Sequence, residues 1–509
     1  MFACFVIVDS IGLSKTGMLW DELAVATNGE TYMGYLKNFD FSQRNWSLND
    51  EHPPLGKYIY GVSRKITKYS RFLTNLDSLY PESRALTFSR FFSVLMGGLA
   101  VAALFLMTSQ FFGRLTGFFA ALFLATNPHF LAYTRIASLE MPLLLFSLIF
   151  IWSFTHAVNR GLTPLGSDPK MGCIRWVLVA VLLGASVSSR TNGFFLFFLF
   201  EAGLLLFYKK ELFTKNHIWK IFLPALSLLF MYLIWPWLWP HPIHNFFESI
   251  DRGLEVHTKE YFLGKMGFSP FYYYFVYFIA TTPLYQLFFF FVFGILLIKK
   301  YPLKKNTSLI LFLFLCFLTP FLASFVPLKQ DGIRYVQFFL PAFCILSAVS
   351  MSKVGLSLSG IIPNWFRNFA MVLVVIISLC IPLRFYPYYT NYYNGLFGSL
   401  NKIAQNKTFE MGWWGEGSLE AVEKVNSLVK PGQTVFVDFA PGHTVPSFIE
   451  GVKPIKLWQG EPDFIIVNLF AKWYGDGYKT ESYAIERNYE LIYEVKVAKK
   501  VTIVWVFSK

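Results

Sequence analysis

Long apolar runs alternate with short polar stretches over the first three-quarters of the chain. Ten runs fall at about 85–111, 115–134, 139–158, 174–189, 193–208, 219–238, 271–298, 307–327, 335–352 and 368–385. A membrane-spanning helix needs roughly 20 apolar residues, so each run predicts a span. A shorter run at the N-terminus, "MFACFVIVDSIGL", is expected to form a clipped first span. The pattern predicts a polytopic α-helical membrane protein with about 11 transmembrane helices.

The pattern changes after about residue 387. "EGSLEAVEKVNSLV" has helical spacing and ends at the breaker "KPGQ". Four segments, "TVFVDF", "DFIIVN", "YELIYEVKV" and "VTIVWVF", are typical of strands. We therefore expect a transmembrane module over 1–386 and a small α/β domain over 387–509.

Composition agrees with the membrane prediction. Hydrophobic residues make up 55% of the 509 residues and charged residues only 15%, against about 25% charged in soluble proteins. The formal net charge is +14. Its lysines and arginines gather in alternate short loops, which is typical of cytoplasmic loops and does not indicate a nucleic-acid partner. This places the protein in a plasma (inner) membrane with a cytoplasmic N-terminus and an extracytoplasmic 387–509 domain.

The long outer loop of about 14–84 opens with an acidic pair, Asp21 and Glu22, in "MLWDELAVATNGE". Neighbouring residues on a helix or strand do not share a face. One carboxylate is therefore expected to point into a site, while the other braces a loop or pairs with a base. The alternative is a solvated loop start.

The same loop contains "EHPPLGKYIYG", which places Glu51, His52 and Lys57 around a Pro-Pro turn. Two prolines stiffen the backbone, which suits a loop that holds polar groups in place. The alternative is a rigid turn before an amphipathic helix. Glu51 and His257 are weak candidates for a divalent metal, but no helical metal-ligand spacing occurs and no metal is assigned.

Charged residues also stand at the outer ends of several predicted spans. Glu140 opens one span, and Arg90, Arg190 and Arg334 stand at the ends of others. A single arginine there is explained by snorkelling to lipid headgroups. A ring of arginines beside carboxylates indicates a phosphate site, because arginine binds phosphate oxygens in a bidentate way. A carboxylate can act as a base toward a hydroxyl, so a lipid-phosphate-linked sugar would suit this surface.

Several motifs, in order, resemble the protein O-mannosyltransferase-like family of GT-C glycosyltransferases (glycosyltransferase family 39, prokaryotic type). They are "WDE", "EHPPLGK", "ASLEMPLLLF", "YLIWPWLWPHP", "TTPLYQL", "DGIRYVQFFLPAF", "YPYYTNYYNGLFGS" and "FEMGWWGEGSLEAVEKVN". Each motif is short, but their joint order extends over nearly the whole chain.

The resemblance implies an inverting transfer of a hexose, mannose first, from a polyprenyl-phosphate donor to a hydroxyl, with Ser/Thr of protein as the first acceptor. It implies Asp21 as the general base and Glu22 as its support. Arg90, Arg190, Arg334 and Lys57 are expected at the donor phosphate. Glu51, His52 and Glu140 are expected either to contact the acceptor or to organise the site. No cofactor is required by this chemistry, although a divalent metal stays open.

Two alternatives accompany this prediction. Aminoarabinose transferases share the GT-C layout and related early motifs, so the acceptor could be lipid A or a cell-surface glycan. A flippase for lipid-linked sugars would also collect charge near phosphate. Transporters, however, place polar sites near the bilayer midplane between repeats, whereas the charges here cluster at one face and no repeat is evident.

Overall fold

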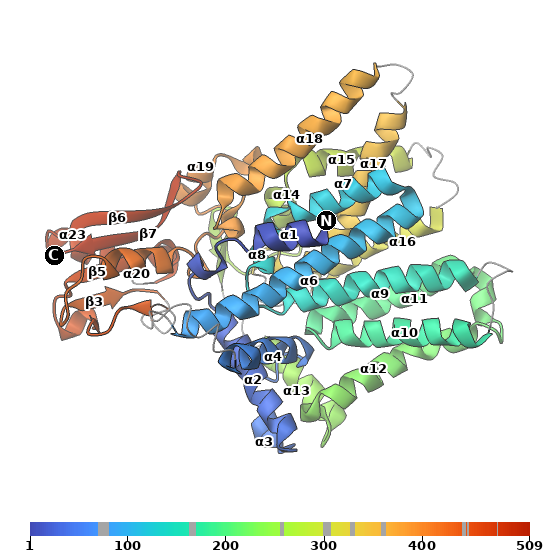
Figure 1. Cartoon of the computed structure of the whole chain (residues 1–509), viewed down its shortest axis with the longest axis horizontal. Helices are drawn as coiled ribbons and strands as arrows, with labels where there is room; N and C mark the ends of the chain where they lie inside the picture. The colour runs from blue at the N-terminus through green and yellow to red at the C-terminus, as the bar shows by residue number, and fades with distance from the viewer. Residues whose placement is uncertain are drawn as a thin grey trace.

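The computed structural model describes residues 1–69, 81–161, 169–254, 259–298, 307–325, 331–357, 363–439, 444, 447–475 and 477–509. A bundle of long helices makes up most of the molecule, and an α/β region lies against one end of it (Figure 1). We call residues after α18 (Asn364–Phe385) the C-terminal region.

Six helical stretches within the described residues are long and apolar enough to cross a membrane. They are built from α6 (Pro81–Phe112), α9 (Glu140–Gly161), α11 (Phe195–Tyr208), α16 (Thr307–Leu318), α17 (Leu340–Ser357) and α18, some extended by 3₁₀ turns. Two bent helix pairs raise the number to eight if each pair is one span. The helical membrane fold is confirmed.

The count of about eleven spans is not confirmed. The first apolar run forms α1 (Phe2–Asp9), whose eight residues reach only about 12 Å of a roughly 30 Å hydrocarbon core. The runs near 174–189 and 219–238 form the shorter apolar helices α10 (Pro169–Val187) and α12 (Leu223–Ile234).

Both bends have local causes. α7 (Arg114–Ala125) and α8 (Pro128–Thr134) meet at 65°, where the Asn127 side chain caps α8 and Pro128 opens it. α14 (Tyr273–Thr281) and α15 (Leu284–Ile298) meet at 120° around Thr282 and Pro283. Thr282 is extended, as expected before proline, so the single span predicted over 271–298 is two helices.

The loop between α1 and α6 folds into α2 (Glu22–Lys37), the short α3 (Gln43–Trp46) and α4 (Leu55–Tyr69). α2 and α4 pack backbone to backbone. A Cβ on Gly29 would lie 1.9 Å from the Lys57 carbonyl oxygen, and one on Gly61 would lie 2.3 Å from Gly29, so only glycine fits this crossing. α13 (Pro242–Leu254) contacts this loop through Arg252, which donates to Asp50 at 2.7 Å. The hairpin of β1 (Glu260–Phe262) and β2 (Lys265–Gly267) contacts the residues after α18, since the Leu263 backbone N–H donates to the Thr408 carbonyl oxygen at 2.7 Å.

The C-terminal region contains a five-stranded sheet of order β4-β3-β5-β7-β6. β3 (Thr434–Val437) is parallel to β4 (Lys453–Pro454) and to β5 (Phe464–Asn468), whereas β7 (Val501–Ser508) is antiparallel to β5 and to β6 (Glu490–Val497). Helices α19 (Leu400–Gln405), α20 (Ser418–Asn426), α22 (Leu469–Tyr474) and α23 (Gly477–Glu486) accompany it. The expected α/β character and all four predicted strands are confirmed.

The C-terminal region is docked onto the bundle by specific contacts. The Asn394 side chain donates to the Thr282 carbonyl oxygen at 2.8 Å, at the α14–α15 bend. The Trp414 ring lies edge-on to Tyr133 of α8 at 5.8 Å, and Gly17 of the first loop packs against Leu419 of α20. These contacts fix the region over the helix ends where the charged residues gather.

Candidate active site

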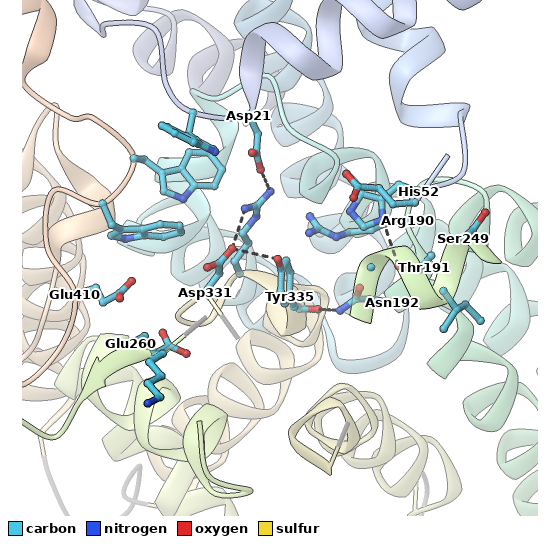
Figure 2. A pocket seen from close by; sticks show the side chains of 18 of the residues that line it. Asp21, His52, Arg190, Thr191, Asn192, Ser249, Glu260, Asp331, Tyr335 and Glu410 are labelled. Atoms are coloured by element: carbon cyan, nitrogen blue, oxygen red, sulfur yellow. Dashed lines mark hydrogen bonds and ion pairs between the residues drawn. The ribbon is translucent and has the colours of Figure 1, made fainter. Parts of the chain in front are cut away.

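A cavity of about 710 Å³ lies between the end of the helix bundle and the C-terminal region. Asp21, Glu51, His52, Arg190 and Arg334 are among the residues that line it. Figure 2 shows Asp21 above the cavity, His52 and Arg190 on one side, and Glu260 and Glu410 on the other.

The two members of the acidic pair point to different places. Asp21 lines the cavity and its side chain is 32% exposed. Glu22 is fully buried, and its carboxylate accepts from the Leu19 backbone N–H at 2.9 Å and the Ala137 N–H at 3.0 Å. It also pairs with Arg90. Asp21 is therefore presented to a ligand, while Glu22 ties the first loop to the bundle.

Arg334 connects Asp21 to the rest of the charged group. Its guanidinium donates to the Asp21 carboxylate, to Glu140 at 2.5 Å and to Asp331 at 3.3 Å. Arg190 donates to the same Glu140 oxygen. Glu140, buried at the start of α9, thus holds two arginines side by side, and both arginines line the cavity. Two arginine side chains at one wall match the geometry that recognises a phosphate group.

Aromatic rings also pack against the guanidinium groups of Arg334 and Arg190. The Arg334 guanidinium carbon lies 4.5 Å from the centre of the Trp414 ring, and that of Arg190 lies 4.5 Å from the Tyr335 ring. Trp414 is 2% exposed, and its backbone N–H donates to Glu416 at 3.0 Å. A desolvated cation–π contact adds to the ion pairs and restricts where the guanidinium can lie.

The Pro-Pro loop places His52 at the cavity. The Leu55 backbone N–H donates to the Ser188 carbonyl oxygen at 3.0 Å, which ties the loop to the end of α10 beside Arg190. Burial, with Arg190, Lys57 and Arg334 nearby, holds the pKa of His52 well below its usual range. His52 is therefore a neutral imidazole at neutral pH, able to make hydrogen bonds without adding charge. Glu51 also lines the cavity and accepts from the Asn49 amide at 3.0 Å.

Arg90 and Lys57, predicted at the donor phosphate, lie beneath the cavity loops, and neither lines the cavity. Arg90 donates to Glu22 and to the carbonyl oxygens of three residues of the first loop: Leu13, Thr16 and Gly17. Lys57 donates to the carbonyl oxygens of Asn49 and His52. Both cations therefore hold loop backbone in place.

An aromatic wall, formed by the C-terminal region together with Trp20 of the first loop, faces the charged group. Phe439 comes two residues after β3, and Phe470 lies in the first turn of α22, directly after β5. The Trp20 ring is 5.8 Å from Phe439, Phe439 is 5.3 Å from Phe470, and Phe470 is 4.5 Å from Tyr474. We call Trp20, Phe439, Phe470 and Tyr474 the aromatic strip. All four line the cavity. None of them was predicted from the sequence as a site residue.

Polar groups lie at the far end of the aromatic strip. The Tyr474 hydroxyl donates to Glu410, and the Tyr273 hydroxyl donates to Glu260 at 2.7 Å. Lys259 also lines this end. The cavity therefore has arginines at one side, an aromatic strip along its length and carboxylates with a lysine at the other side.

A divalent metal is typically held by several His, Cys, Asp or Glu side chains close together. Among the described residues, no group of three or more His, Cys, Asp or Glu side chains has the geometry to hold a metal ion. Of the two weak candidates, Glu51 lies at the cavity, and His257 is outside the described residues.

Comparison with known proteins bears on this arrangement. The family model of dolichyl-phosphate-mannose-protein mannosyltransferases matches residues 4–251, just under half of the chain. This match contains the acidic pair, the Pro-Pro loop, Glu140 and Arg190. No curated protein matches the sequence significantly.

Solved structures extend the likeness to nearly the whole chain. ArnT from Cupriavidus metallidurans, solved with bound undecaprenyl phosphate, matches with a TM-score of 0.52 at 14% identity, over 99% of this chain and 97% of that chain. The apo oligosaccharyltransferase of Archaeoglobus fulgidus matches with a TM-score of 0.51 at 12% identity, over 94% of this chain and 72% of that chain. The fold is that of the GT-C glycosyltransferases, which confirms the resemblance indicated by the motifs.

Proposed function

We propose that the protein is an inverting glycosyltransferase that moves a sugar from a polyprenyl-phosphate donor to a hydroxyl acceptor in the cavity. The observation that carries the proposal is the position of Asp21, which faces the cavity while it is held by an arginine that shares Glu140 with a second arginine. Base and phosphate-binding groups therefore lie at one wall. The bound undecaprenyl phosphate in the ArnT structure supports the donor class.

In the proposed reaction the acceptor oxygen attacks the anomeric carbon of the donor sugar. The new C–O bond forms as the bond from that carbon to the phosphate oxygen breaks. The acceptor proton passes to Asp21, and polyprenyl phosphate leaves as an anion. Arg334 and Arg190 stabilise the charge that develops on the phosphate. The phosphate is already a good leaving group, so no general acid is needed.

The other predicted residues receive supporting roles. His52 and Glu51 contact the sugar or acceptor from the Pro-Pro loop, because both line the cavity. Glu140 fixes both arginines, Glu22 and Arg90 hold the first loop, and Lys57 holds the Pro-Pro loop. We accordingly assign the phosphate to Arg190 and Arg334 alone.

The family match favours mannose or another hexose as the sugar and Ser/Thr of protein as the acceptor. The early motifs related to those of aminoarabinose transferases keep lipid A or a cell-surface glycan as the second candidate acceptor. The reaction would occur at the extracytoplasmic membrane face, where the C-terminal region lies in the predicted topology. A flippase is disfavoured, because the charged residues gather at helix ends beside this region.

The test is sugar transfer by the full-length protein in lipid nanodiscs. We expect transfer from polyprenyl-phosphate mannose by the wild type, and a loss of about 10²–10⁴-fold for Asp21→Asn. Glu490→Gln, an exposed carboxylate-to-amide change on β6, is the matched control. Normal transfer by a folded Asp21→Asn variant would move the base to another carboxylate. Movement of the lipid across the bilayer without transfer would support the flippase.

A further inference from the structure

We propose that the aromatic strip is the acceptor subsite, and that it binds the sugar ring of a saccharide acceptor. The proposal rests on the proposed transferase function, and it favours the second candidate acceptor, a glycan, over Ser/Thr of protein. It assigns the C-terminal region a direct part in substrate binding.

Two rings of the aromatic strip lie where parallel strands of the C-terminal sheet end. β3 and β5 are parallel neighbours, and the chain leaves their carboxyl ends as it reaches Phe439 and Phe470. In open α/β sheets, ligands bind at the carboxyl ends of such strands. Here Phe439 and Phe470, which follow that edge, line the same cavity as Asp21, so a ligand at the edge occupies the cavity that holds the proposed base.

Trp20 links the aromatic strip to the loop that carries the proposed base. Trp20, at one end of the strip, is the residue before Asp21 and is 51% exposed. Its ring stacks on Phe439 with an interplanar angle of 27°. Trp20, Phe439 and Asp21 line the same cavity, so an acceptor ring bound against Trp20 would share that cavity with the proposed base.

The aromatic and polar side chains of this wall suit the two kinds of surface that a sugar ring has. A pyranose has faces of C–H groups and a rim of hydroxyls. The strip offers aromatic faces, and polar side chains border it: Glu410 and Lys259 at one end and Asp21 at the other. The volume of about 710 Å³ lies within the roughly 300–1,000 Å³ typical of small-molecule sites, so it suits one donor sugar and one acceptor ring.

A peptide fits this wall less well. Extended peptides commonly bind by adding a strand to an exposed sheet edge. The edge strands of the five-stranded sheet are β4 and β6, whereas the strands whose ends meet the cavity, β3 and β5, are interior. In the β1–β2 hairpin, the Tyr261 backbone N–H already donates to the Tyr474 hydroxyl at 2.6 Å.

The experiment compares Phe470→Leu with Trp458→Leu in the full-length protein in nanodiscs. Trp458 is an aromatic residue of the same region that is 77% exposed and does not line the cavity, so it is the matched control. The first readout is calorimetric binding of mannotriose without donor. We expect binding by the wild type and by Trp458→Leu, and about tenfold weaker binding by Phe470→Leu, as expected for loss of one aromatic contact.

The second readout is transfer from polyprenyl-phosphate mannose, with mannotriose or a Ser/Thr-rich peptide as acceptor. We expect the saccharide to be used, with KM raised about tenfold in Phe470→Leu and kcat nearly unchanged. Exclusive use of the peptide, or equal saccharide KM values for the two variants, would overturn the subsite while the transferase function stood. Saccharide binding that depends on Phe470, without transfer from any lipid donor, would support the subsite and overturn the function.

Discussion

The two walls of the cavity differ in chemistry and in their origin along the chain. The bundle wall is charged, and its groups Asp21, Glu140, Arg190 and Arg334 pair with one another. The wall from the C-terminal region is mostly aromatic, and its rings follow the ends of two parallel strands. In the proposed function this difference becomes a division of roles: the bundle wall would bind the donor phosphate and carry the base, and the aromatic wall would bind the acceptor.

We expect the largest loss of activity from a substitution at Arg334, which forms ion pairs with Asp21, Glu140 and Asp331. Arg334→Lys keeps the charge but removes the fork that reaches three carboxylates. We expect kcat to fall about 10²–10³-fold, a loss of the size seen when a group that stabilises transition-state charge is removed. Steady-state transfer in nanodiscs measures this, with Arg487→Lys, an exposed ion pair of the C-terminal region, as control. A loss below about threefold would show that the charged wall does not need the arginine geometry.

A substitution at Glu22 tests whether the two members of the acidic pair have different roles. Glu22→Gln leaves the buried Arg90 without its carboxylate. Breaking one partner of a buried pair costs about 3–5 kcal/mol, so we expect a clear drop in thermal stability. The kcat of the molecules that remain folded should stay near the wild-type value, because Glu22 faces away from the cavity.

The control for this variant is the double change Glu22→Gln with Arg90→Met, which removes the unpaired charge and should recover part of the stability. A melting scan and a transfer assay on the same nanodisc sample separate the two effects. A large fall in kcat with unchanged melting would place Glu22 in the chemistry beside Asp21.

The sequence predicted the charged wall better than the aromatic one, for a physical reason. Acids and arginines at the ends of apolar runs stand out, because charge next to a membrane span is costly unless it has partners or a task. Position along the chain does not give side-chain direction, however. Arg90 stands near the start of an apolar run and Lys57 stands in the Pro-Pro motif, yet the charged end of each donates to loop carbonyl oxygens.

The aromatic strip gave a weaker signal. Phe439 and Phe470 are two of 58 phenylalanines, and only the sheet order makes them neighbours. The available indication was that Phe439 is the last residue of the predicted strand "TVFVDF" and that Phe470 comes two residues after "DFIIVN". The apolar runs likewise predicted most helices. Hydropathy alone could not predict the 120° bend at Thr282 and Pro283, because the residues on both sides of it are apolar. Only the Thr-Pro step marks the bend in the sequence.

Trp414 is the point where the two walls meet, because this residue of the C-terminal region packs on Arg334 of the bundle. Trp414→Leu removes the cation–π contact and should lower kcat about tenfold, while Trp414→Phe keeps an aromatic face and should lose less. The KM for the acceptor should change little in either variant. A KM effect without a kcat effect would instead assign Trp414 to acceptor binding.

The dependence of stability on pH concerns Lys57, which lies outside both walls. Burial lowers the pKa of the Lys57 ammonium to about 7, although Glu51 and Asp50 favour its charged form. In the unfolded chain its pKa is near 10.4. Between these values the unfolded state binds more protons, so this group's contribution to stability rises as pH increases from about 7 toward 10.

Lys57→Met removes this dependence and leaves two loop carbonyl oxygens without their donor. We expect the melting temperature of the wild type to gain on that of Lys57→Met as pH is raised from 7 to 9. Lys65→Met, a less buried lysine on the same helix, should show no such trend. A difference that shrinks over this pH range would mean that Lys57 is fully charged in the folded protein, with its hydrogen bonds to Asn49 and His52 outweighing the cost of burial.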